Sequence, residues 1–115
     1  MARRLRTNAQ IDTFIGRVIG QAQHHAPWVE TVIEPLSDEV RERLDLSVDK
    51  IEVYERNGQL ARTCWVTIGG HRYAFSYAYR PRKIELRDGS TQGTVIYSFD
   101  NNTPLKAIAR VVARL

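Results

Sequence analysis

The side chains with the greatest chemical potential in this chain are few and scattered. Cys64 is the single cysteine and a candidate nucleophile, whereas His24 and His25 are adjacent. A reactive thiolate needs an electropositive, partly exposed site, and neighbouring residues on a helix point about 100° apart, so they do not readily share a metal ion. His71 could act as an acid or base only if a carboxylate approached it. These residues predict no catalytic site, no metal site and no cofactor.

Aromatic side chains form a more regular pattern. The stretch GHRYAFSYAY, residues 70–79, alternates rings with small or polar side chains. Such a period of two is typical of a β-strand with one buried face. The turns on either side decide whether the rings recognise a ligand or fill a core.

Three reversals are expected in the middle of the chain. Asn57-Gly58 and Gly69-Gly70 suit tight hairpins because their residues tolerate positive φ, and a third reversal is expected at Arg80-Pro81. Two-residue loops would place Val53 opposite Arg62 and Ile51 opposite Cys64. They would also place Cys64 opposite Phe75, Val66 opposite Tyr73, and Ile84 opposite Tyr77.

These pairings collect the apolar side chains on one side of the sheet, here called the apolar face. Its expected members are Ile51, Val53, Leu60, Cys64, Val66, Ile68, Tyr73, Phe75, Tyr77, Ile84 and Leu86, with Val95, Tyr97 and Phe99 from a fifth strand over 94–99. A slip of one residue would send the whole set to the other side, so its agreement supports the register. The rings are therefore expected to fill the core, with Cys64 as an inert buried thiol.

Helices are expected on both sides of this strand region in sequence. Apolar residues spaced by three and four predict a helix from about Thr7 or Asn8 to Ala26, and a short acidic helix over 38–45 has Ser37 as its N-cap. Whether 28–34 is helix or strand is left open. Thr103 and Pro104 begin a last helix.

The expected fold class is α+β, with N-terminal helices, a five-stranded antiparallel meander sheet and a C-terminal helix packed on the sheet. Residues 1–115 are expected to form a single domain in which residues 1–6 are a flexible basic tail.

The opposite side of the sheet, here called the Trp65 face, is more informative. Its expected members are Glu52, Tyr54, Ala61, Thr63, Trp65, Thr67, Arg72, Ala74, Ser76, Ala78, Lys83, Glu85 and Arg87. A plainly solvated face would carry long polar side chains throughout, whereas here an indole stands among small residues. Three coverings are considered: one of the protein's own helices, a second copy of the chain, or single-stranded nucleic acid stacked on Trp65 and Tyr54 beside Arg72, Lys83 and Arg87.

Charge and composition narrow the partners. The net charge is +4, acids are concentrated in residues 30–55, and Lys106, Arg110 and Arg114 form a basic row four residues apart. No apolar run is long enough for a membrane span, no apolar segment follows the basic N-terminus as in a secretory signal, and one cysteine gives no sign of an oxidising compartment. A cytoplasmic protein without a membrane partner is expected.

No diagnostic motif identifies the function, so three functions are carried forward. The first is a small non-enzymatic interaction module, a homodimer through the Trp65 face. The second is a nucleic-acid-binding accessory protein that uses the basic C-terminal half. The third is a small-molecule binder or enzyme with a pocket between the sheet and the first helix, near His71, Tyr73, Tyr77 and Tyr79.

Overall fold

The computed structural model describes residues 2–57 and 59–115, and the side chains of these residues apart from 2, 56 and 59–61. The fold is α+β, as expected from the sequence. The helices are α1 (Asn8–His25), α2 (Ile33–Arg43) and α3 (Leu105–Ala113). The strands are β1 (Ala2–Leu5), β2 (Lys50–Arg56), β3 (Gln59–Ile68), β4 (His71–Ala78), β5 (Lys83–Asp88) and β6 (Val95–Phe99).

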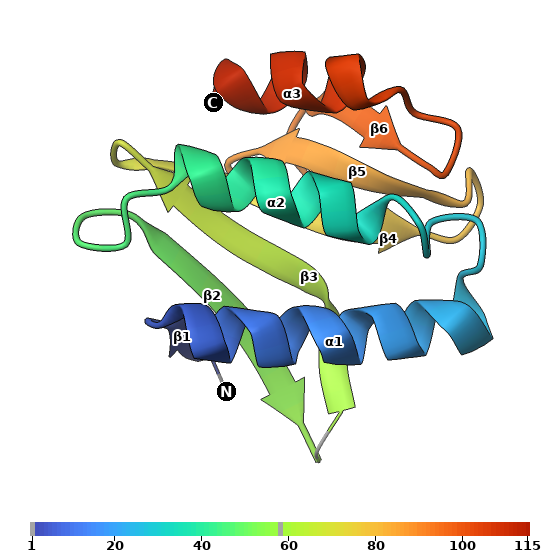
Figure 1. Ribbon diagram of the computed structural model, residues 1–115, viewed down its shortest axis with the longest axis horizontal. Helices are drawn as coiled ribbons and strands as arrows, with labels where there is room; N and C mark the ends of the chain where they lie inside the picture. Colours follow the sequence, from blue (N-terminus) through green and yellow to red (C-terminus); the bar gives the residue numbers. More distant parts are fainter. Residues whose placement is uncertain (1, 58) are drawn as a thin grey trace.

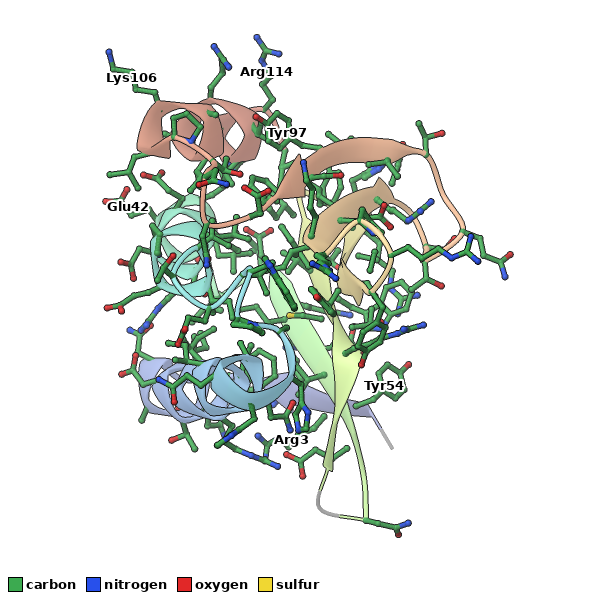
Figure 2. All side chains as sticks on the ribbon, turned by 90° about the vertical axis from the view of Figure 1, so that its right-hand side faces the viewer. Arg3, Glu42, Tyr54, Tyr97, Lys106 and Arg114 are labelled. Atoms are coloured by element: carbon green, nitrogen blue, oxygen red, sulfur yellow. The ribbon has the colours of Figure 1, made fainter. Side chains whose placement is uncertain are left out.

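The strands form one antiparallel sheet in chain order, β1 to β6. All three helices lie on the same side of this sheet (Figure 1), and a view turned by 90° places them as one layer beside it (Figure 2). Within the described chain, the Trp65 face is therefore not covered by a helix. Of the three coverings considered, a helix from the described part of this chain is therefore excluded.

The strand count differs from the five that the sequence predicted, because a sixth strand, β1, is present. Residues 2–5 pair with β2 instead of forming a flexible tail, and Leu5 lies opposite Ile51 with 1% of its surface exposed. Arg4 contributes a hydrogen bond from Nη2 to the carbonyl oxygen of Asp49. The burial of Leu5 and the ladder with β2 hold this segment at the sheet edge.

The tight turns set most of the register. Asn57 has a φ of 55°, and Gly69 and Gly70 have φ values of 58° and 82°, as primed hairpin turns require. Gly58 of the first expected turn lies outside the described residues. The pairings predicted across the second and third reversals are confirmed, with Cys64 opposite Phe75 and Ile84 opposite Tyr77.

Elsewhere the observed register differs from the predicted one at two bulges. Val53 lies opposite Cys64 and not Arg62, because a bulge between Val53 and Glu55 gives β3 extra residues. The displacement is an even number of residues, so the apolar face is preserved. A second irregularity between Leu86 and Arg87 places Val95 opposite Arg87, and Val95 is 38% exposed instead of joining the apolar face.

The first helix begins and ends where the sequence indicates. Thr7 and Gln10 form a capping box, in which the backbone N–H of Gln10 donates to Thr7 Oγ1 at 3.2 Å. Pro27 follows the C-cap residue, Ala26.

The second helix begins earlier than expected. Ser37 is not its N-cap but lies inside α2 and donates to the Ile33 carbonyl, while Pro35 is tolerated in the first turn. The backbone amides of Thr31 and Val32, just before α2, both donate to Asn101 Oδ1, so a residue from the loop before α3 holds the segment that leads into this helix.

The hydrophobic core has two parts. The larger one joins α2 and α3 to the sheet and includes Phe99, Leu86 and Ile108, each at most 1% exposed. The smaller one joins α1 to β1 and β2 around Ile11 and Phe14. Several α1 residues that border both parts remain only partly buried.

Candidate functional site

An apolar cavity of about 270 Å³ lies between α1, α2 and the apolar face. Figure 1 shows that the two helices run in opposite directions across the sheet. Arg41 of α2 donates to Asp12 Oδ1 at 2.6 Å and to Asn8 Oδ1 at 3.2 Å, which ties the C-terminal end of α2 to the start of α1. The apolar wall residues are Leu5, Ile11, Phe14, Ile15, Val18, Ala22, Ala26, Val29, Ile33, Leu36, Val40, Ile51, Cys64, Val66, Phe75, Tyr77 and Ile84.

Polar groups stand among the lining residues as a minority. Gln21 and His25 come from the last turns of α1, and Arg62 and Tyr79 come from β3 and the loop after β4. The Tyr77 and Tyr79 rings meet edge to face with centroids 5.0 Å apart. The Arg62 guanidinium carbon lies 5.4 Å from the centre of the Tyr79 ring, which is a cation–π distance. Because Gln21, His25, Arg62 and Tyr79 are all exposed, they mark where the cavity opens to solvent.

Cys64 forms part of the cavity wall. Burial among apolar side chains raises the pKa of its thiol to about 12. The group is therefore neutral at physiological pH and a poor nucleophile. The prediction that Cys64 faces inward is confirmed, although its side chain is only partly buried.

The four residues predicted to share one pocket are divided between two sites. Tyr77 and Tyr79 line the cavity, whereas His71 and Tyr73 lie in a separate groove beside α3, about 580 Å³ in volume. In this groove His71 meets a carboxylate, since its Nε2 lies 2.5 Å from Asp88 Oδ1. Both side chains of the pair are exposed to solvent, and such ion pairs contribute little to the free energy of unfolding.

The basic row on α3 reaches the same groove in part. Arg110 and Arg114 contribute to its lining, while Lys106 does not. Figure 2 shows Lys106 and Arg114 directed away from the sheet into solvent. The row is therefore a solvated helix face, and the structure does not bring its charges to the cavity.

Side chains of the Trp65 face pack on one another and cover part of this surface. The Arg72 guanidinium carbon stacks 3.8 Å from the centre of the Trp65 ring, and the neighbouring Ala74 is 0% exposed. A nucleotide base could stack on this side of the indole only after Arg72 moved. The structure therefore brings Trp65 and Arg72 together and lowers their capacity for base stacking.

The other charges of the Trp65 face are engaged as well. Arg87 donates to Glu85 Oε1 at 2.9 Å and to the Gly93 carbonyl at 2.8 Å, and Lys83 lies 3.7 Å from Asp100. Tyr54 remains 38% exposed. Arg87 and Lys83 are therefore paired with carboxylates, while Arg72 is stacked on the indole.

Sequence reasoning missed the contribution of α2 and β1 to the cavity. The apolar spacing of Leu36 and Val40 signals a buried helix side, but it does not reveal that empty space lies next to that side. Within the residues that the structure describes, no group of three or more His, Cys, Asp or Glu is placed to hold a metal ion. No described helix is both long and apolar enough to cross a bilayer.

A family model described as "Integron cassette protein VCH_CASS1 chain" matches residues 11–109, from the first turn of α1 into α3. No curated protein matches the chain. The matched segment includes both helices that border the cavity and strands β2 to β6.

Proposed function

The chain belongs to the family of the integron cassette protein VCH_CASS1, and we propose that it is a binding protein for a small, mainly apolar molecule. The ligand occupies the space between α1, α2 and the apolar face. One observation carries this proposal: a cavity of about 270 Å³ whose lining residues are mainly apolar. A binding function requires no chemistry from the wall, in keeping with the neutral thiol of Cys64.

The size of the cavity limits the ligand. Protein interiors are close-packed, and an engineered cavity of about 150 Å³ already binds benzene. By proportion, this cavity accepts an apolar group of about ten non-hydrogen atoms. Transfer of such a group out of water is favourable in proportion to the apolar area buried, so the cavity supplies a driving force without any specific polar contact.

Thermal unfolding with a panel of small apolar compounds tests the proposal. Toluene, indole, naphthalene and 1-octanol are suitable probes. A ligand that binds only the folded protein, present at ten times its dissociation constant, stabilises it by about 1.4 kcal/mol. For a chain of this size the midpoint temperature then rises by about 5 °C.

A matched pair of variants locates the binding. Ala22 lines the cavity, and Ala22→Phe places a benzene-sized group in it; Ala113→Phe adds the same group at the exposed end of α3. Compounds that stabilise the wild type should stabilise the Ala113 variant equally and have no effect on the Ala22 variant. If no compound shifts the midpoint, or if both variants respond alike, the cavity is not the binding site.

A second proposal concerns the Trp65 face, because no described helix covers it. We propose that two copies of the chain associate through this face, with Trp65 at the centre and Tyr54 towards the rim. Light scattering should give a dimer mass that Trp65→Glu reduces to a monomer, with Leu105→Glu as a control on the distant α3. A monomer at high micromolar concentration contradicts association, and oligonucleotide binding that weakens steeply with salt would assign the face to nucleic acid instead.

A further inference from the structure

The charges around the cavity all have one sign. Among its lining residues in the described chain there is no aspartate or glutamate, and the two formally charged side chains are Arg41 and Arg62. A ligand that enters from solvent therefore meets no carboxylate among the residues that line the cavity. This asymmetry bears on the chemistry of the ligand.

The two arginines differ in how far they are already engaged. Arg41 holds Asp12 and Asn8 through both terminal nitrogens, so its charge is compensated within the protein. Arg62 makes no ion pair with a carboxylate in the described part of the chain, where its guanidinium stacks over the Tyr79 ring. Stacking leaves the edge of a guanidinium, with its N–H donors, available to an anion.

Arg62 also stands in the right place relative to the apolar wall. It precedes Cys64 by two positions on β3, and both residues line the cavity. Tyr79 and Gln21 line the same site. A molecule with its hydrocarbon part against Cys64 can therefore keep a polar end in the water beside Arg62.

From these observations we infer that the ligand is an amphipathic carboxylic acid, with a hydrocarbon part of about ten non-hydrogen atoms in the cavity and its carboxylate beside Arg62. This inference rests on the proposed binding function and specifies the ligand class. Carboxylates suit guanidinium donors because two parallel N–H groups match their two oxygens. The charge selects the acid, while the apolar walls supply most of the affinity.

Three probes with one tail and different head groups test the inference: octanoate, 1-octanol and octylammonium. Isothermal titration should rank octanoate as the tightest and octylammonium as the weakest. The preference of octanoate over 1-octanol should be about fivefold, as expected for a charge pair near solvent. It should fall as salt is raised, while the affinity for 1-octanol stays constant.

Variants assign the preference to Arg62. Arg62→Gln should abolish the preference for octanoate and leave 1-octanol binding unchanged, and Arg62→Lys should restore part of it. Arg72→Gln, on the Trp65 face, should change neither. Circular dichroism of each variant confirms that it is folded.

The outcomes distinguish the carboxylate inference from the proposal that the cavity binds a small apolar molecule. If 1-octanol binds as tightly as octanoate, the cavity is a binding site but the carboxylate assignment is wrong. A preference for octanoate that persists in Arg62→Gln overturns the role of Arg62. If none of the three probes binds, both the inference and the binding function fail.

Discussion

Helices α1 and α3 meet the same sheet in different ways. On α3, Ala107, Ile108 and Val112 are at most 6% exposed and belong to the larger core with Phe99. On α1, Ile15 and Val18 are partly buried and line the cavity. The close-packed core and the cavity are therefore in different parts of the molecule. The core beneath α3 supplies most of the stability, and the cavity lies beside α1.

The largest effect is expected when one isoleucine in each region is truncated to alanine. Ile108→Ala should cost about 3–4 kcal/mol of unfolding free energy, because it leaves a new void in a close-packed cluster. Ile15→Ala should cost about 1 kcal/mol, since Ile15 already borders empty space and solvent. Urea denaturation of the two variants measures both values. Equal losses would show that the region beneath α1 is packed as tightly as the other.

A smaller effect comes from adding atoms. Ala107 and Ala22 are both buried on helices, at 6% and 5% exposure, but only Ala22 lines the cavity. Ala107→Leu should destabilise the protein by about 1–3 kcal/mol through overpacking, whereas Ala22→Leu should change stability by less than about 0.5 kcal/mol because the space exists. A large loss in the Ala22 variant would mean that the cavity wall cannot accommodate further atoms.

A third effect, absent at neutral pH and seen only in alkaline solution, comes from Cys64. Burial raises the pKa of its thiol from the ordinary 9.0 to about 12, so the folded state keeps a proton that the unfolded state loses. This contribution to stability is complete below pH 9 and is lost as pH rises towards 12, by up to about tenfold in the unfolding constant per pH unit. The advantage of the wild type over Cys64→Ala should therefore shrink between pH 9 and 11. A constant difference would indicate that water reaches the thiol.

Much of the sheet could be predicted from the sequence because local turn chemistry determines it. Gly69 and Gly70 admit the positive φ of a hairpin, and the alternation of Tyr73, Phe75 and Tyr77 then assigns the two faces. The bulge beside Val53 could not be predicted, since both registers bury the same residues. The edge strand β1 carries little apolar signal apart from Leu5, so its residues looked like a solvated tail.

The cavity was predicted only in outline. Tyr77 and Tyr79 signalled aromatic walls near the first helix, but the partner residues His71 and Tyr73 belong to the groove beside α3. The sequence specifies which side of a helix is apolar, whereas the space left between two helices depends on their distance and angle. The start of α2 was predicted wrongly for a related reason, because Asn101, which binds the amides just before this helix, comes from a distant loop.

The place of β1 at the sheet edge has a consequence for the order of folding. Strands β2 to β6 each pair with the next strand along the chain, but β1 must wait for β2 across both intervening helices. Closing that long loop carries the largest entropic cost in the sheet. We therefore expect strands β2 to β6 to pair first. The pairing of β1 with β2, which buries Leu5 beneath α1, is expected to follow.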